Sequence, residues 1–253
     1  MIIINDEYFK SVVSTNACTE AEIADCYFHF QPIYCLKTDK IKLYEALLRS
    51  DSFDNVEEAV AAIMAQGKED LLTLHTLNAI KPYFNKAEQE NINFSLNFEP
   101  TQIASAKFPA LVKYFFNRFN IPKQNIILEI TERSCELPMY QKMIENAKEL
   151  IADGFHFAID DFGTGMSNFE LLSQLKIKLI KIDGCFSNSA FENQHSRGIL
   201  EIAATFKEKF NCAVCIEGLE TQDHIDFVKN LDFCFGQGYG LAMPGPLNFA
   251  VAS

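Results

Sequence analysis

The chain has 253 residues, 48% of them hydrophobic, and carries a formal net charge of -12. This length suits one large α/β domain or two small ones, and the hydrophobic share is ample for a single core. The acidic balance argues against binding to the phosphate backbone of duplex DNA or RNA, although bound divalent cations can still present a positive site to a small anion.

The first residues, 1–7, hold a short apolar run followed by acids, which is neither a signal peptide nor a membrane span. We therefore expect a cytoplasmic protein whose eight cysteines are reduced. Cys212 and Cys215 have C-x-x-C spacing, but residues three apart on a strand point to opposite faces. We expect neither a disulfide nor a metal site from this pair.

Strand and helix patterns alternate along the chain. Residues 27–34 and 41–47 predict two strands that pair as a hairpin about the polar turn 38–40. Apolar residues at helical spacing predict helices over 56–66, 70–84, 101–119, 138–152, 195–210 and 221–229, with a shorter amphipathic segment over 168–175. Short apolar runs predict further strands at 94–98, 125–130, 157–159, 179–183 and 212–216, and a last strand with its exit loop at 233–238.

About eight strands with intervening helices predict a TIM-like (β/α)8 barrel with an antiparallel first strand pair. Residues 1–24 would form an N-terminal extension and residues 25–253 the barrel, as a single domain. A doubly wound open sheet is the alternative fold. It would gather polar residues at one switch point, whereas this chain places them at nearly every strand end.

Asp160 and Asp161 are the most informative of these polar residues, because they follow a buried run and precede Gly163 and Gly165. Two carboxylates in contact repel by roughly 4 kcal/mol at an effective dielectric near 20, so a fold that buries them usually brings in a cation. For this pair alone, a helix N-cap is an equally good interpretation. The other strand-end residues are Glu45, Asn97, Glu129, Lys181, Glu217 and Gln237.

Carboxylate and amide oxygens with one lysine, and without histidine or cysteine, suit Mg²⁺ or Mn²⁺ rather than zinc. Two such ions close together activate a water molecule and stabilise the oxygens of a phosphodiester under attack. The residues by themselves therefore predict metal-assisted hydrolysis of a phosphate ester. For any one of them, a cap or a surface acid is the alternative.

Short motifs around these residues resemble the EAL-domain family, the cyclic-di-GMP phosphodiesterases. The signature is Glu45-Ala46-Leu47-Leu48-Arg49, preceded by Gln31-Pro32-Ile33. In family order there follow Asn97-Phe-Glu-Pro, Glu129-Ile-Thr-Glu132, Asp160-Asp161-Phe-Gly-Thr-Gly165, Lys181-Ile-Asp183, Glu217-Gly-Leu-Glu220 and Gln237-Gly-Tyr239. The resemblance covers about residues 25 to 247, and the ordered set is specific where a lone Glu-Ala-Leu is not.

The resemblance implies a two-metal site and the opening of cyclic-di-GMP to linear pGpG. One Mg²⁺ or Mn²⁺ would be held by Glu45, Asn97, Glu129 and Asp160. Asp161 would serve the second ion, with Asp160 bridging and Glu217 nearby. Ca²⁺ would bind but support little turnover, because its looser coordination relaxes the geometry.

The resemblance also implies roles around the metals. Lys181 would position and polarise the attacking water, helped by Gln237. Arg49 would grip a substrate phosphate, a task that suits its planar fork. The remaining implied substrate contacts are Gln31, to guanine or ribose, Asp183 and Glu220. Glu132 would anchor the loop 161–168, which in the family links dimer contacts to metal affinity, so a homodimer is expected.

The sequence departs from the family pattern in three places. Glu99 replaces a common serine near the metal-binding amide, Met166 replaces a common aromatic residue, and residues 50–65 lack the usual Trp-x-His-Pro. Some relatives are catalytically inactive, so the alternative is a non-catalytic module that binds cyclic-di-GMP or a regulatory protein partner. The sequence shows no cyclase, receiver or sensor module, so regulation is expected to come from a partner.

Overall fold

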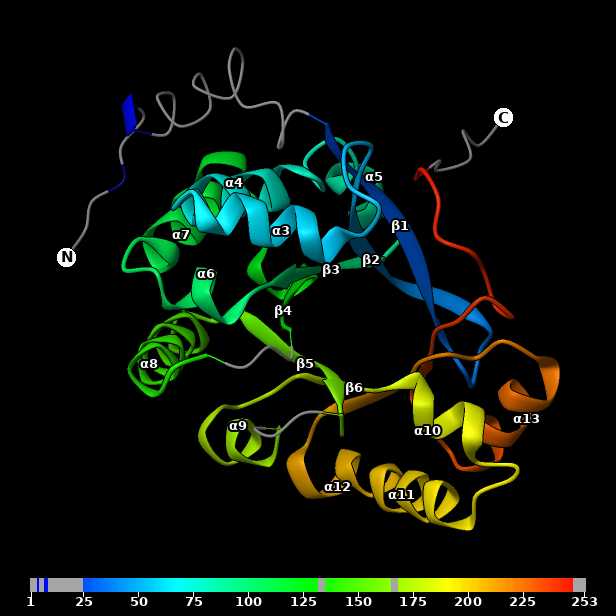
Figure 1. Ribbon diagram of the computed structural model, residues 1–253. Coiled ribbons are helices and arrows are strands. Elements are labelled where there is room, and N and C mark those ends of the chain that lie inside the picture. The colour runs from blue at the N-terminus through cyan, green and yellow to red at the C-terminus, as the bar shows by residue number, and fades with distance from the viewer. Residues whose placement is uncertain (1–3, 5–6, 9–24, 132–134, 165–167, 248–253) are drawn as a thin grey trace, which may run out of the picture.

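A computed structural model describes residues 4, 7–8, 25–131, 135–164 and 168–247 (Figure 1). Within them, eight strands close into a barrel in the order β1 to β8, which confirms the predicted TIM-like fold. The predicted antiparallel first pair is also confirmed, because β1 runs antiparallel to both of its neighbours, β2 and β8. The other neighbouring strands are parallel, as in a (β/α)8 barrel.

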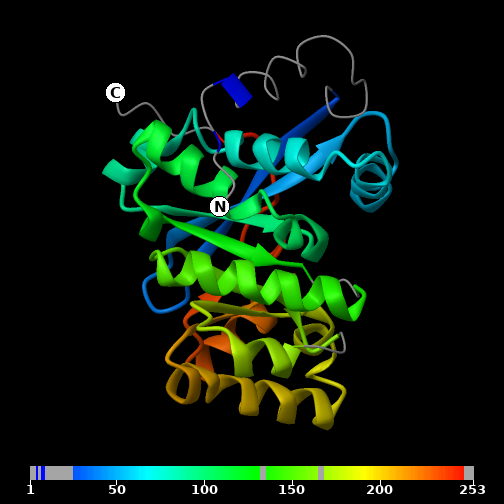
Figure 2. The ribbon, with the colours of Figure 1, turned by 90° about the vertical axis from the view of Figure 1, so that its left-hand side faces the viewer.

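The strands are β1 (Cys26–Cys35), β2 (Lys40–Ser50), β3 (Asn93–Phe98), β4 (Ile126–Ile130), β5 (His156–Phe162), β6 (Leu179–Ile182), β7 (Ala213–Ile216) and β8 (Phe235–Gly236). The helices are α3 (Val56–Ala65), α4 (Glu69–Asn78), α5 (Phe84–Gln89), α6 (Pro100–Ala104), α7 (Phe108–Phe119), the 3₁₀ turn η1 (Lys123–Asn125), α8 (Leu137–Ala152), α9 (Asn168–Gln174), α10 (Gly184–Ser189), α11 (Gln194–Ala204), α12 (Phe206–Phe210) and α13 (Gln222–Asn230). The helices surround the strands, with α3 and α4 on the side opposite α11 and α12 (Figures 1 and 2).

Two apolar layers hold the barrel together. The larger one lies between the strands and the helices, and every residue of β4 is buried. A smaller one fills the inside of the barrel and consists of Ile33, Leu43, Ile127, Ala158, Leu179 and Cys215. Because side chains alternate between the two faces of a strand, β1, β2, β4, β5, β6 and β7 contribute to both layers.

The structure corrects three predicted helices. The helix expected over 70–84 ends at Asn78, and Pro82 explains why it does not continue, because proline disfavours helical backbone at the preceding residue. The helix expected over 195–210 is divided into α11 and α12 at Thr205, whose hydroxyl donates to the carbonyl of Ile202 at 2.7 Å. Helices α5 and α10 were not predicted.

The helix expected over 101–119 is divided into α6 and α7, and a residue far along the chain stabilises the break. The buried amide of Asn146, on α8, donates to the carbonyls of Ile103 at 2.7 Å and of Ser105 at 2.9 Å. The first bond satisfies the Ile103 carbonyl at the end of α6, and the second adds to the bond that the Ser105 carbonyl accepts from Phe108 N–H at 3.1 Å.

The cysteines in the described part of the chain are free thiols, as predicted, and Cys212 and Cys215 form no disulfide. Across the described residues, no helix combines the length and the hydrophobicity that crossing a lipid bilayer requires. The boundary at residue 25 stays a prediction. Of the N-terminal extension, Ile4 and Tyr8 pack against the main core.

Asn146→Leu tests the role of the buried amide at the α6–α7 break. The substitution keeps the branched shape of the side chain but removes its N–H donor and leaves the Ile103 carbonyl unbonded, so we expect the free energy of unfolding to fall by about 1–3 kcal/mol. The exposed Lys148→Leu, on the same helix, is the matched control and should change it by less than about 0.5 kcal/mol. Urea unfolding measures both, and equal losses would contradict this role of the amide.

Candidate active site

Inside the barrel, polar side chains follow the inner apolar layer toward the carboxyl ends of the strands. Residues two apart on a strand share a face, so each apolar residue of the inner layer predicts the orientation of the residue two positions later. In β2, β4, β5, β6 and β7 the pairs are Leu43 and Glu45, Ile127 and Glu129, Ala158 and Asp160, Leu179 and Lys181, and Cys215 and Glu217. The last lies just beyond its strand. Strand register thus brings these predicted residues together at the carboxyl end of the barrel.

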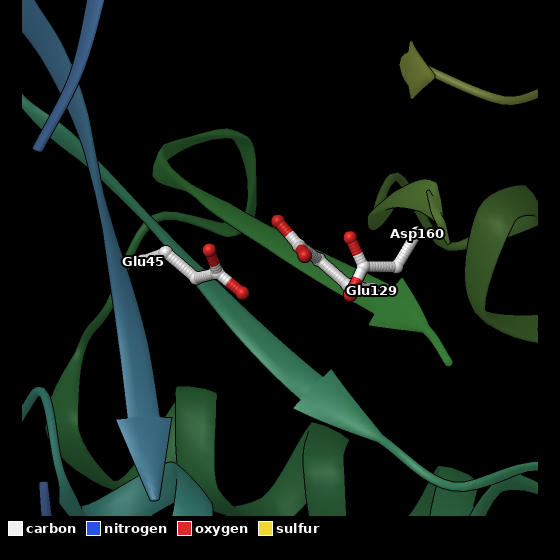
Figure 3. Close-up of side chains that lie close together, drawn as sticks. All are labelled: Glu45, Glu129 and Asp160. Atoms are coloured by element: carbon white, nitrogen blue, oxygen red, sulfur yellow. The ribbon is translucent and has the colours of Figure 1, made fainter. Parts of the chain in front are cut away.

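Lys181 lies at the centre of the cluster and is only 1% exposed. Its Nζ lies 2.7 Å from Asp160 Oδ1, 2.9 Å from Glu217 Oε1, 3.0 Å from Glu45 Oε2 and 3.1 Å from Glu129 Oε2. Figure 3 shows Glu45, Glu129 and Asp160 pointing toward one another from three strands. Four carboxylates face one ammonium group, which leaves three negative charges without a counterion if all four are ionised.

Two amides hold Glu45 in place. Asn97 Nδ2 donates to Glu45 Oε1, and Gln237 Nε2 donates to Glu45 Oε2, both at 2.6 Å. Gln237 Nε2 also donates to Gln31 Oε1 at 3.0 Å, and Gln31 Nε2 donates to the carbonyl of Ala242 at 3.2 Å. The predicted substrate contact Gln31 is therefore buried and bonded within the protein, where it orients Gln237.

The carboxylates of the cluster differ in how readily they ionise. Burial raises the pKa of Glu45, but Lys181 and the two amides outweigh it, so that the pKa lies below its usual value. Burial, with repulsion from Glu45 and Asp160, raises the pKa of Glu129 to about 8. Burial also raises the pKa values of Asp160 and Glu217. Glu45 is therefore the fixed anion, whereas Glu129 favours the protonated form near neutral pH and Asp160 and Glu217 ionise less readily than ordinary carboxylates.

Asp161 lies at the irregular end of β5. Its φ of 50° is in the left-handed region, and the β5–β6 register shifts between Ile159 and Phe162. Burial, Asp160 and contact with Asp183 raise the pKa of Asp161 to about 7. The strand therefore continues beyond Ile159, where the sequence predicted its end.

The donor set fits two divalent cations. Carboxylate oxygens of Glu45, Glu129 and Asp160 lie within 4.8 Å of one another, and so do oxygens of Asp160, Asp161 and Glu217. Asp160 belongs to both groups, as expected of a bridging ligand. Asn97 Oδ1 is buried without a hydrogen-bond partner among the described residues, so this oxygen is available as a ligand to a cation.

Two cavities adjoin the cluster. The first, of about 290 Å³, is lined by Glu45, Asn97, Asp160 and Asp161 at the cluster and also by Arg49 and Glu99. The second, of about 320 Å³, is lined by Glu217 and Gln237 and also by Gln31, Asp183, Glu220 and Tyr239. The structure thus places the predicted substrate contacts around the cluster, divided between the two cavities. Glu132 and Met166 lie outside the described residues.

Sequence reasoning assigned no role to several lining residues. Tyr239 is 60% exposed at the rim of the second cavity, and its place in the motif Gln237-Gly-Tyr239 was the available signal. Phe28 and Glu57 line the first cavity, and no local pattern distinguished them. Glu99, the residue that departs from the family, precedes α6 as its N-cap and lines the same cavity.

The comparisons with known sequences agree on one family. A sequence model described as the EAL domain matches residues 16–244. The chain is 32% identical over 164 residues to the probable cyclic di-GMP phosphodiesterase PdeA of Escherichia coli strain K12, over 63% of this chain and 22% of the relative. It is 29% identical over 234 residues to the probable cyclic di-GMP phosphodiesterase PdeB of the same strain, over 88% and 44%. The chain spans less than half the length of these curated relatives.

Solved structures share the fold. The PaMucR phosphodiesterase in its c-di-GMP complex matches with a TM-score of 0.74 at 25% identity, over 89% of this chain and 94% of that chain. The FimX EAL domain matches with a TM-score of 0.76 at 19% identity, over 94% and 98%.

The raised pKa values predict that a higher pH lowers the Tm of the metal-free protein and enlarges the Tm increase that a divalent cation gives. Glu129 and Asp161 have folded-state pKa values of about 8 and about 7, above those of an unfolded chain. The stability that they contribute is therefore present below about pH 4 and is lost as the pH rises through about 7 to 8. We expect the Tm with EDTA to fall between about pH 6 and about pH 8.5, while the Tm increase on adding Mg²⁺ or Mn²⁺ grows, because metal binding displaces protons. Thermal unfolding across this range measures both, and a metal effect that shrinks with pH would contradict the assignment.

Proposed function

The chain belongs to the EAL-domain family, and on that premise we propose that it hydrolyses cyclic-di-GMP to linear pGpG with two divalent cations, lowering the level of this second messenger. Residues 25–253 would form the catalytic unit. The observation that carries the proposal is the pair of three-carboxylate groups that share Asp160 around Lys181. The two relatives named phosphodiesterases support the same reaction.

The two groups divide the ligands. Glu45, Asn97, Glu129 and Asp160 would hold one cation, and Asp160, Asp161 and Glu217 the other. The chemistry that such cations supply when bound is activation of a water molecule and charge stabilisation at the phosphodiester oxygens. Glu45 is suited to be the permanent anchor, because two amides keep its carboxylate ionised and oriented.

Lys181 would orient the attacking water. Burial lowers the pKa of its ammonium group, but the surrounding carboxylates outweigh burial and raise the pKa well above its usual value, so the group stays charged. A charged ammonium group donates hydrogen bonds and accepts none, so Lys181 would stabilise a hydroxide rather than remove a proton. Gln237 would assist through its amide, which Gln31 orients.

The two cavities would receive the substrate on either side of the reacting phosphate. Arg49 lines the first cavity, and its Nη1 donates to the carbonyl of Leu48 at 2.8 Å. No carboxylate of the described residues pairs with its guanidinium, so its other N–H groups are available to a phosphate. Gln31, Asp183 and Glu220 line the second and would contact the other half of the molecule. Glu132 would anchor the loop 161–168.

We propose Mg²⁺ or Mn²⁺ as the working ions and Ca²⁺ as an inhibitor, because the oxygen donors suit all three and only the smaller ions hold a strict geometry. Reduced cysteines in the described residues support a cytoplasmic location. Phe169 and Ile202, exposed at 66% and 61%, support a homodimer, and regulation through a protein partner remains part of the proposal.

The non-catalytic alternative receives less support. The ligands predicted at the two metals are all present in the described residues, and they converge. A protein that binds cyclic-di-GMP in calorimetry without producing pGpG would favour the alternative.

Hydrolysis of cyclic-di-GMP is the direct test. We expect the purified protein to form pGpG with Mg²⁺ or Mn²⁺, as measured by chromatographic separation of the products. Glu45→Gln should lower kcat/KM by roughly 100-fold or more, because it removes the fixed charge of the metal site at constant volume. The exposed Glu192→Gln should leave the rate unchanged. The absence of product from folded, metal-loaded protein would overturn the proposal.

Lys181→Met separates catalysis from metal binding. Removing the ammonium group should lower kcat by roughly 100-fold, because the water loses its hydrogen-bond donor. Mn²⁺ should bind at least as tightly as to the unmodified protein, because one positive charge leaves the cluster. Calorimetry with Mn²⁺ measures this, and weaker binding would show that Lys181 holds the ligands in place instead.

A further inference from the structure

Helix α3 forms a wall of the first cavity, and it lies in the region that departs from the family pattern. Val56, Glu57 and Val60 of α3 line the cavity. Val60 and Ile63 also belong to a separate apolar cluster that packs α3 against α4 and against Cys26 at the start of β1. The wall is therefore held by a core of its own and presents a fixed surface to the cavity.

The side of the cavity around α3 is lined mainly by apolar residues, one of which is aromatic. The ring of Phe28 packs against that of His75, with centroids 5.3 Å apart, which restricts its orientation. The aliphatic lining residues are Leu48, Val56, Val60 and Leu72. This part of the cavity, with its apolar residues and one aromatic ring, is suited to a nucleobase, because every base has a flat face that can stack on a side-chain ring.

Glu57, an exposed residue of α3, lines the cavity beside these apolar residues. No hydrogen bond or ion pair of the described residues engages its carboxylate. The adjacent Glu58 differs, because its backbone N–H donates to Asn55 Oδ1 at 2.7 Å and its Oε1 accepts from Asn55 Nδ2 at 3.2 Å. Glu58 therefore belongs to the N-terminal cap of α3, whereas the Glu57 carboxylate is available to a ligand.

We propose that this part of the first cavity is a guanine-reading subsite in which Glu57 selects the base, an inference that rests on the proposed function. The Watson–Crick edge of guanine carries two adjacent donors, N1–H and N2–H₂, and a carboxylate has two acceptor oxygens that pair with both. Adenine presents one donor beside an unprotonated nitrogen, so a carboxylate oxygen would face a lone pair. Glu57 thus accepts guanine and rejects adenine.

Arg49 lies in the same cavity and makes this placement consistent with a nucleotide. It is four residues beyond Glu45 on β2, which corresponds to roughly 13 Å along the strand. That span is comparable with the length of one nucleotide. A phosphate held between the acidic cluster and the Arg49 side chain therefore leaves its base within reach of the α3 wall.

Glu57→Gln and Glu58→Gln form a matched pair, because both remove one negative charge from the first turn of α3 and only the first lines the cavity. A glutamine offers one acceptor and one donor, the arrangement that pairs with adenine. Glu57→Gln should raise the KM for cyclic-di-GMP by roughly tenfold, more than it lowers kcat, and should narrow the preference over cyclic-di-AMP by a similar factor. Glu58→Gln should resemble the unmodified protein.

Calorimetric binding of cyclic-di-GMP, with and without divalent cation, accompanies the kinetics. If both variants behave alike in KM, base preference and binding, the inference is overturned while the proposed function stands. If the unmodified protein binds cyclic-di-GMP without hydrolysing it, the proposed function fails. Weaker binding by Glu57→Gln than by Glu58→Gln then still supports the subsite, and equal binding overturns it. An unmodified protein that does not bind cyclic-di-GMP overturns both.

Discussion

The ammonium group of Lys181 among four carboxylates is the interaction on which the rest of the structure depends. Neither side of this cluster is stable in the barrel alone, because a buried ammonium without anions loses its proton and buried carboxylates without a cation gain one. Lys181 and its four partners come from β2, β4, β5, β6 and the residue after β7, so the cluster forms only when the barrel is closed in the correct register. A slip of one residue in any of these strands would turn its polar side chain toward the helices. The cluster therefore specifies the register more than it adds stability.

One lysine does not balance the charge that the strands bring together, and the surplus gives the site its chemistry. Glu45 is kept ionised by two amides and Lys181, whereas Glu129 and Asp161 favour their protons near neutral pH. Cation binding and proton release are consequently one linked equilibrium at this site. The carboxylates that lower the stability of the metal-free barrel at high pH thereby provide affinity for a divalent ion.

Local patterns predicted the barrel and most of the cluster, because the alternation of strands with helices and the acids at strand ends can both be recognised in short stretches of sequence. The features that were missed depend on segments far apart in the chain. The break between α6 and α7 is bonded by Asn146, 43 residues beyond Ile103, and a helical pattern cannot reveal such a partner. Phe28 and Glu57 share a cavity only after β1 and α3 pack together. The left-handed backbone of Asp161 follows from the register shift in β5, which side-chain periodicity does not report.

The reversed direction of β1 decides where the polypeptide enters the barrel. Cys26, the first residue of β1, pairs with Ser50, and Gln31 pairs with Glu45, so β1 begins at the catalytic rim and runs away from it. In an all-parallel barrel the first strand would begin at the opposite end, remote from the chemistry. Here β1 begins at the end of the barrel that carries the acidic cluster. Its second residue, Tyr27, pairs with Arg49, so the polypeptide enters the barrel beside the first cavity rather than at the opposite end.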